Sequence, residues 1–458
     1  MRKVVVVGAG IAGLTAARDL AAAGDDVLLL ESSPRVGGKL RRAEVAGIPV
    51  DVGAEAMLNR RPEGVGLARE VGLPIEHPRL ASSRIWSRGA LRPLPRSLMG
   101  VPLDLAALES SGVLSPEGLA RVREEPALPP ERLDGDVSVG DLVDRRFGPE
   151  VTDRLVEPLL GGVYAGQARL ISARASVPQL VDLATRGSIT EQAGGLPTTY
   201  DGPVFAGIAG GMGRLPGMLA AELSVRTDAT VRELRRTDTG WALTVGPTTA
   251  PERLEADAVV VAVPPPAAAR LLTDAVPAAA RELEAIEQAS MVVVTMAFRE
   301  SDVPVLAATD SSGFLVPPVE GRRIKAATFS FSKWAWVRAA GAGVLALRTS
   351  LGRHREEAAL QASDEELVAW SLADLREAVG PLPGPVDTHV QRWGGGLPQY
   401  AVGHLDRVAR IRAAVTAVVD EPRGAPLALC GAAYDGVGVP AVVASAHRAA
   451  GEVLRALS

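Results

Sequence analysis

Three glycines and one acid near the N-terminus are the first residues whose types and spacing could do chemistry. Gly8, Gly10 and Gly13 follow the unbroken apolar run 4–7 and precede apolar residues at helical spacing. At such a turn the first glycine allows the tight bend, the second lets backbone N–H groups approach a pyrophosphate, and the third allows close helix–strand packing. Glu31 ends the next apolar run, where a carboxylate accepts ribose hydroxyls. The pattern predicts a dinucleotide site with these contacts: Gly8, Ala9, Gly10, Ile11, Ala12, Gly13 and Glu31.

A second glycine-rich loop follows the acid at once. Residues 31–39 read ESSPRVGGK, which is similar to the flavoprotein pattern E-x-x-x-R-x-G-G-[RK]. In that pattern Gly37 and Gly38 would let the backbone run against the cofactor, and basic residues would face its phosphates. An ordinary surface loop is the alternative. Because NAD-binding proteins have no need of this loop, its position directly after the acid favours FAD.

Arginines are concentrated in a segment without acids, residues 77–103. Their four-residue spacing imitates a helix face, but Gly89, Pro93 and Pro95 argue against a helix, so we expect strand, turn and loop. Two interpretations stay open. The arginines could form a solvated basic surface, or a wall that binds substrate carboxylates through bidentate contacts. The arginines of the segment are Arg79, Arg84, Arg88, Arg92 and Arg96.

Composition narrows the class of protein. The chain has 458 residues, too many for one compact core, and a net charge of −5, which gives no reason to expect a nucleic-acid partner. Its single cysteine, Cys430, excludes an internal disulfide framework and fits a reducing cytosol. No apolar run is long enough for a transmembrane helix. We expect a cytoplasmic protein, with peripheral membrane contact left open, and no metal site.

The remaining elements place these residues in an α/β fold. Strands expected over 225–234, 241–245 and 256–263 return the chain to the N-terminal unit, and a strand at 427–430 with a helix over 441–457 closes it. We therefore predict a Rossmann-like FAD-binding domain, a mixed α+β substrate domain and a helical insertion, the architecture of flavin amine oxidases and of p-hydroxybenzoate hydroxylase. The predicted boundaries are 1–80, 205–286 and 400–458 for the FAD-binding domain, 81–103 and 287–399 for the substrate-binding domain, and 104–204 for the helical domain.

Three further segments are similar to one family. They are RLVEPLLGGVYAG at 154–166, RW with PQYAVGH within 392–404, and GAAYDGVGVP at 431–440. Together they resemble the oxygen-dependent protoporphyrinogen oxidase family, and most closely its bacterial branch that acts as coproporphyrinogen III oxidase. The resemblance runs essentially end to end. The N-terminal glycine motif and the closing segment are shared with many flavin amine oxidases, whereas the other two are specific to the porphyrinogen branch.

The resemblance implies further FAD contacts. The Val231 backbone would lie at the adenine, Trp393 beside the flavin, and residues 437–439 near its pyrimidine end. Two positions depart from the family pattern: Arg61 stands where some relatives have lysine, a position linked to substrate binding, and Ala54 where many have proline. The implied contacts are Ser32, Lys39, Gly53, Ala54, Glu55, Ala56, Val231, Trp393, Val437, Gly438 and Val439.

The expected activity is FAD-dependent oxidation of coproporphyrinogen III to coproporphyrin III in haem biosynthesis, with molecular oxygen as acceptor and a ferrochelatase downstream. Oxidation of protoporphyrinogen IX is the alternative, followed by flavin amine oxidation and a non-catalytic flavin-bound scaffold. Coproporphyrinogen carries four propionates and protoporphyrinogen two, so the arginines favour the former. We expect Arg61 and Arg84 to bind substrate, and no catalytic side chain beyond the flavin.

Overall fold

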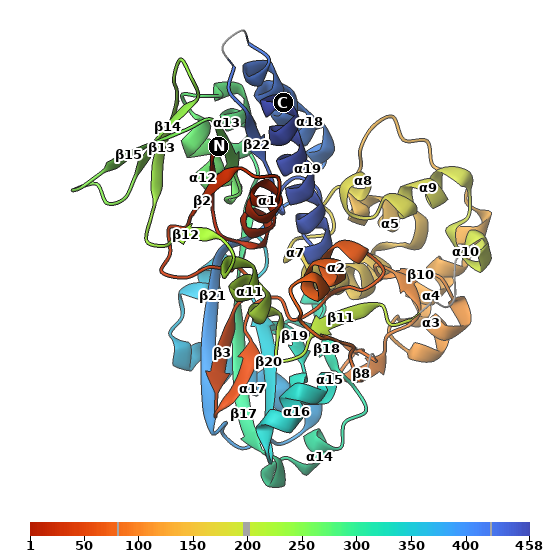
Figure 1. The fold of residues 1–458 in the computed structure, drawn as a ribbon. Helices are drawn as coiled ribbons and strands as arrows, with labels where there is room; N and C mark the ends of the chain where they lie inside the picture. The colour runs from red at the N-terminus through yellow and green to blue at the C-terminus, as the bar shows by residue number, and fades with distance from the viewer. Residues whose placement is uncertain (80–81, 196–201, 422–423) are drawn as a thin grey trace.

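The computed structural model describes residues 1–79, 82–195, 202–421 and 424–458. Figure 1 shows three parts: a dinucleotide-binding domain that contains both termini, a large sheet below it, and a group of helices to one side. Residue 80, a predicted domain boundary, and residues 196–201 of the predicted helical insertion lie outside the described residues. None of the helices in the described ranges is both long and apolar enough to span a bilayer.

A parallel five-stranded sheet is the centre of the dinucleotide-binding domain. Its strands, in spatial order, are β12 (Ser224–Arg226), β2 (Asp26–Leu30), β1 (Lys3–Val7), β16 (Ala258–Val261) and β22 (Leu427–Leu429). Both faces of β1 are buried: Val4 and Val6 belong to the core under α1 (Ile11–Ala22) and α19 (Val439–Leu457), and Val5 and Val7 to the core on the opposite face. A strand covered on both faces needs no polar side chain, which explains the unbroken valine run.

Further elements complete this domain. Helices α12 (Pro265–Leu272), α13 (Pro277–Glu284) and α18 (His404–Val419) cover the second face, while α2 (Pro62–Glu70) and α11 (Leu215–Ala220) flank the first. Three small sheets are attached: β3–β4 (Arg42–Val45, Ile48–Asp51), β5–β11–β6 (Met57–Leu58, Phe205–Ile208, Ile75–Glu76) and β13–β14–β15 (Val231–Arg236, Trp241–Val245, Glu252–Ala256). The strand expected over 225–234 was wrong in extent, because the chain leaves the parallel sheet after Arg226 and turns at Asp228, whose φ is 51°.

The second domain is built on a seven-stranded sheet. Its order is β21 (Asp387–Pro398), β17 (Gln288–Arg299), β20 (Val344–Leu351), β19 (Ile324–Thr328), β18 (Gly313–Leu315), β7 (Arg84–Ser87) and β8 (Ala90–Pro93). The strand and turn expected in the arginine-rich segment are confirmed as β7 and β8. Helices α14 (Pro304–Ala307), α15 (Ser330–Lys333), α16 (Ala335–Gly341) and α17 (Asp364–Val379) belong to the same domain.

The two faces of this sheet have different neighbours. Helix α17 covers one face, where Thr349 Oγ1 and Ser371 Oγ lie 2.8 Å apart. The adjacent residue, Arg348, points the other way and donates to the Gly53 carbonyl of the dinucleotide-binding domain at 2.7 Å. Likewise Phe314 joins the core under α17, and Leu315 packs on the core of the helical domain. We call these the α17 face and the cofactor face.

The helical domain fills the predicted insertion. It contains α3 (Leu105–Ser111), α4 (Pro116–Arg123), α5 (Val139–Phe147), α6 (Pro149–Val151), α7 (Glu157–Tyr164), α8 (Ala173–Ser176), α9 (Pro178–Arg186) and α10 (Ile189–Gln192), with the strand pair β9–β10 (Ser97–Leu98, Val101–Pro102) beside it. Between α6 and α7 the chain forms a π-helical turn at Thr152–Val156. Pro158 in the first turn of α7 supplies the reason, because it offers no N–H to the preceding turn.

Candidate active site

The two glycine-rich loops lie directly against each other. The amide of Gly37 donates to the Ala9 carbonyl at 2.8 Å, and residues 10 and 37 form an isolated parallel bridge. A Cβ on Gly38 would lie 3.4 Å from the Cα of Gly10. Gly37 and Gly38 both have positive φ values, 108° and 54°, which side chains rarely adopt. The loops therefore form one continuous backbone surface at the start of α1.

Each glycine of the first loop has a distinct surrounding. Gly8 has φ 102°, as a tight turn requires, and a Cβ on Gly13 would overlap the Gly8 carbonyl oxygen. The space beside Gly10 is different, because no protein atom lies within 4 Å of where its Cβ would stand. Gly10 is also the residue that precedes the first turn of α1, where unpaired N–H groups and the helix dipole favour an anion. This open space at a helix start fits the pyrophosphate of a dinucleotide.

Glu31 lies at the end of β2 beside these loops. Its carboxylate accepts from the Ala9 amide at 2.8 Å and from the Ser33 amide at 2.9 Å. The Glu31 carbonyl accepts from Ala229 at 2.8 Å, so the chain that leads into β13 at Val231 runs beside it. The structure thus brings together the predicted ribose ligand and the segment predicted at the adenine.

Basic side chains line the second loop. Lys39 is partly buried, and burial lowers the pKa of its ammonium, with no acid contributing. Its ammonium has no hydrogen bond or ion pair within the described ranges of the chain. Burial and the neighbouring Arg41 also lower the pKa of Arg35, although Glu31 opposes this. A partly buried cation that lacks an acid partner fits an anionic group of the cofactor, which the phosphates of FAD would supply.

The stretch from Asp51 to Ala56 passes between the second loop and the large sheet. A Cβ on Gly53 would overlap the Lys39 carbonyl oxygen and would stand 3.2 Å from the Trp393 ring. Trp393 donates from Nε1 to the Val52 carbonyl at 3.0 Å. The close neighbours of Gly53 are therefore parts of the protein on both sides, and Trp393, predicted beside the flavin, lies against this stretch.

Glu55 has protein partners for its side chain, which the sequence analysis did not expect. Its carboxylate is paired with Lys333 Nζ at 2.5 Å and with Arg348 Nε at 3.1 Å. Burial alone would raise the pKa of Glu55, but Arg348 and Lys333 outweigh it and lower the pKa to about 2. The Glu55 carboxylate is thus held by cations of the sheet domain and is not left to bind FAD.

The start of α19 was predicted at the pyrimidine end of the flavin. Gly438 is the residue before the first turn, Val439 is buried in the core under α1, and Val437 packs against the core of the helical domain. The nineteen residues of α19 make its first turn a strong site of partial positive charge. The residues at 437–439 therefore lie where the dinucleotide-binding domain and the helical domain meet.

The three segments that resemble the protoporphyrinogen oxidase family, residues 154–166, 392–404 and 431–440, also meet here. The rings of Tyr164 and Tyr400 are 5.4 Å apart, and Tyr400 stacks on His404 at 4.0 Å. The Tyr400 hydroxyl donates to the Ala432 carbonyl, and Gln399 Nε2 donates to the Tyr164 carbonyl at 2.8 Å. The first segment, more than two hundred residues earlier in the chain than the other two, thus packs with them as one unit.

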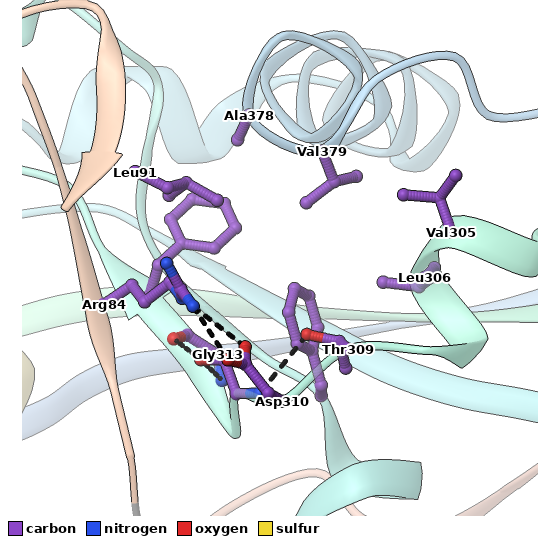
Figure 2. Close-up of a pocket in the computed structure, with 12 residues that line it drawn as sticks. Arg84, Leu91, Val305, Leu306, Thr309, Asp310, Gly313, Ala378 and Val379 are labelled. Carbon is purple, nitrogen blue, oxygen red and sulfur yellow. Dashed lines mark hydrogen bonds and ion pairs between the residues drawn. The ribbon is translucent and has the colours of Figure 1, made fainter. Parts of the chain in front are cut away.

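The structure does not bring the two arginines predicted to bind substrate, Arg61 and Arg84, into one site. Arg61 precedes α2 and is paired with Glu63 at 2.8 Å. Arg84 lies on the α17 face of the sheet beside Phe314, paired with Asp310 at 2.9 Å at the edge of a cavity of about 270 Å³, which Figure 2 shows. The structure therefore does not bring Arg84 to the glycine-rich loops, because alternate residues of a strand point to opposite faces.

Other arginines of that segment bind backbone carbonyls. Arg88 donates to the Leu114 carbonyl at 2.7 Å, and Arg92 to the Ser87 carbonyl at 2.8 Å. The interpretation of the segment as a wall of carboxylate-binding arginines is not supported by these contacts. Within the described ranges, no three acids, histidines or cysteines cluster as metal ligands would.

Sequence reasoning missed three polar residues of this region. Asp51 accepts from the amides of Met212 and Gly213 at 2.8 and 3.0 Å, and burial raises its pKa to about 6. Arg348 and Lys333 hold Glu55. Arg348 alone had a signal, since it is the one charged residue of strand β20, VLALRTSL. The partners of the other two come from distant parts of the chain.

The strand–glycine loop–helix unit, the second loop and the unpaired lysine define an FAD-binding oxidoreductase. A model of the family described as flavin containing amine oxidoreductase matches residues 11–454, and the chain belongs to this family.

Individual relatives match over the whole length. A coproporphyrinogen III oxidase of Mycobacterium tuberculosis is 39% identical, over 100% of this chain and 98% of the relative. The human protoporphyrinogen oxidase is 28% identical, over 99% of this chain and 98% of the relative. A crystal structure from Exiguobacterium sp. 255-15, provisionally assigned as a protoporphyrinogen oxidase, superposes with a TM-score of 0.85 at 29% identity and covers 99% of this chain and 98% of that one.

Proposed function

We propose that the protein oxidises coproporphyrinogen III to coproporphyrin III. Six hydrogens leave the substrate, and their electrons pass through FAD to molecular oxygen, which becomes hydrogen peroxide. The observation that carries the proposal is the 39% identity to a coproporphyrinogen III oxidase over the entire chain. The packing of residues 154–166 against residues 392–404, the two segments specific to the porphyrinogen branch, supports it.

FAD, when bound, would supply the acceptor for each two-electron step by which the six hydrogens are removed. The residues of the chain would bind and orient. The open space at Gly10 and the ammonium of Lys39 would receive the phosphates, and Glu31 would exchange its amide contacts for the ribose. A Cβ on Gly162 would lie 4.0 Å from Leu315, so α7 approaches the cofactor face of the sheet closely. This apolar contact between two domains suits a substrate with a large apolar ring.

Protoporphyrinogen IX is the second candidate substrate, since the human protoporphyrinogen oxidase is also similar over the full length. The number of arginines favoured coproporphyrinogen in the sequence, but Arg84 lies on the α17 face. The preference for the substrate with four carboxylates therefore rests on the relatives and on Arg61. Amine oxidation is the third candidate, because the family model includes enzymes of that chemistry.

An anaerobic reduction experiment separates the candidates. The flavin absorbance of the purified protein should bleach on addition of coproporphyrinogen III, and air should restore it with formation of peroxide. We expect kcat/KM to be higher for coproporphyrinogen III than for protoporphyrinogen IX. Bleaching by amines alone would assign the protein to amine oxidation, and bleaching by none of the three would indicate a non-catalytic flavoprotein.

The proposal includes a place for the reaction. Coproporphyrin III is a metal-free macrocycle, so a ferrochelatase would act on the product. We propose a cytoplasmic location, with contact to a membrane surface left to be tested by cosedimentation with vesicles.

A further inference from the structure

The carbonyls of three successive residues, Asp51, Val52 and Gly53, accept hydrogen bonds from side chains of the large sheet. Arg348 Nη1 donates to the carbonyls of Asp51 at 3.2 Å and Gly53 at 2.7 Å. Trp393 Nε1 donates to the carbonyl between them, that of Val52. Both side chains come from the sheet domain, so this stretch of the dinucleotide-binding domain takes its position from the neighbouring domain.

The other side of the same stretch is bonded to the second glycine-rich loop. The amide of Val52 donates to the Arg41 carbonyl at 2.9 Å, and that of Ala54 to the Lys39 carbonyl at 3.3 Å. The backbone at 51–54 therefore lies between the cofactor loop and Arg348. A change in the position of Arg348 would move this backbone relative to the second glycine-rich loop, which follows Glu31.

Glu55 holds the guanidinium of Arg348 in place. It accepts from Arg348 Nε at 3.1 Å, while Lys333 Nζ binds its other oxygen at 2.5 Å. The Glu55 side chain is 6% exposed and that of Arg348 17% exposed. Buried ion pairs commonly contribute little net stability compared with apolar side chains of equal volume, so fixing one geometry is a better account of this cluster than stability.

We propose that Arg348 is a positioning residue for the flavin, which it serves by holding the Asp51–Gly53 backbone against the second glycine-rich loop. The inference rests on the proposed function, because that function places FAD along this stretch. Arg348 acts through the backbone, and Glu55 acts by orienting Arg348. Arg348 belongs to the sheet whose cofactor face packs against α7. Its contact with the Asp51–Gly53 backbone therefore connects the sheet domain, where substrate would bind, to the domain that would bind FAD.

The test uses the FAD-loaded enzyme with Arg348→Met, Arg348→Lys and a control, Arg376→Met. Arg376 also donates to a backbone carbonyl, that of Leu382, but does so from α17. For Arg348→Met we expect kcat per bound flavin to fall by on the order of ten- to a hundredfold, since small displacements of reacting groups have effects of this size. KM should change little, and the visible spectrum of the bound flavin should shift. Arg348→Lys should recover part of the rate, because an ammonium can reach one carbonyl but lacks the planar fork.

The results separate positioning from a purely structural role. If Arg348 only stabilised the fold, Arg348→Met would lower the melting temperature and the flavin content, yet each bound flavin would keep its normal spectrum and rate, and the proposal would be overturned. If Arg348→Met does not fold, Glu55→Gln releases the same guanidinium while keeping the side-chain shape, and the same spectral shift is expected. The spectrum needs no substrate, so it still tests the inference if the wild-type enzyme proves inactive on porphyrinogens.

Discussion

The amide of Gly37 donates a 2.8 Å hydrogen bond to the carbonyl of Ala9, which joins the two glycine-rich loops into one surface. This hydrogen bond explains why the second glycine-rich loop follows Glu31 so closely in the sequence. A short connection through residues 32–36 is enough to bring the chain back across the start of α1. The backbone at Gly37 and Gly38 is thereby placed beside Gly10.

We expect Gly10→Val to abolish FAD binding while the protein stays folded. Gly10 has φ −70° and ψ 176°, which valine adopts readily, and no protein atom occupies the space of its Cβ. The new methyl groups would therefore collide only with a ligand. Bound flavin after gel filtration is the measurement, and circular dichroism checks the fold.

Gly66→Val is the matched control for Gly10→Val. A Cβ at Gly66 also meets no atom within 4 Å, but the residue lies in α2. This variant should retain its flavin. A Gly10→Val protein with a full complement of FAD would contradict the placement of the pyrophosphate.

Arg61→Ala and Arg84→Ala should differ in their effect on substrate. If Arg61 binds a propionate, its removal loses a charge-assisted contact of about 1.5–3 kcal/mol, which corresponds to a rise in KM of roughly ten- to a hundredfold. Arg84→Ala should leave KM unchanged, because Arg84 lies on the α17 face in a pair with Asp310.

Steady-state kinetics with coproporphyrinogen III measures both variants, and flavin content should match the wild type in each. The pairs that are lost are largely exposed, so stability should change by about 1 kcal/mol at most. If KM rises for Arg84→Ala alone, Arg84 binds the substrate and Arg61 does not.

Arg146→Met should destabilise the helical domain strongly. The side chains of Arg146 and Glu125 are fully buried, and Glu125 also accepts from Ser188, Ile189 and Thr190. Removing the cation leaves a buried carboxylate without its partner, which costs about 3–5 kcal/mol. Denaturant unfolding measures the loss.

The double variant Arg146→Met/Glu125→Leu provides the comparison for this prediction. It removes both charges from the same site, so it should be more stable than Arg146→Met alone. If the single variant unfolds like the wild type, the pair is not buried in solution as it is here.

Acid should weaken the fold through His404. Burial, the largest cause, lowers the pKa of His404 to about 4, where its ring stacks on Tyr400. The Ala433 carbonyl, 2.9 Å from Nε2, acts in the opposite direction but does not offset burial. Below pH 6.5 the unfolded state binds a proton that the folded state does not, so stability is lost as the pH falls from about 6.5 to about 4. The full loss is about 3 kcal/mol by this linkage, since each pKa unit corresponds to about 1.4 kcal/mol.

Unfolding free energies between pH 7.5 and 4.5 measure the effect, and His404→Gln provides the comparison. Glutamine keeps an N–H donor for the Ala433 carbonyl but does not titrate. The wild type should therefore lose more stability than His404→Gln over this range, and equal slopes would show that His404 is not held neutral.

The sequence predicted the elements whose determinants are local. Helix α17 begins with a capping box, in which the side chains of Ser363 and Glu366 each accept from the backbone of the other. The valine run of β1 and the glycine spacing after it predicted the strand, the turn and the start of α1. Spacing along the chain sets these features, because neighbours within a few residues make the deciding contacts.

The tertiary structure decided which face each strand residue uses and which charges meet. Arg84 and Ile85 are adjacent in the sequence, yet the strand period of two places them on opposite faces, and only the packing of α17 shows which face is the α17 face. The sequence indicates Glu55 as a cofactor ligand. In the structure its carboxylate pairs with Lys333 and Arg348, which are about three hundred residues away in the chain. Contacts of this kind depend on how whole domains pack, so the sequence next to each partner does not indicate them.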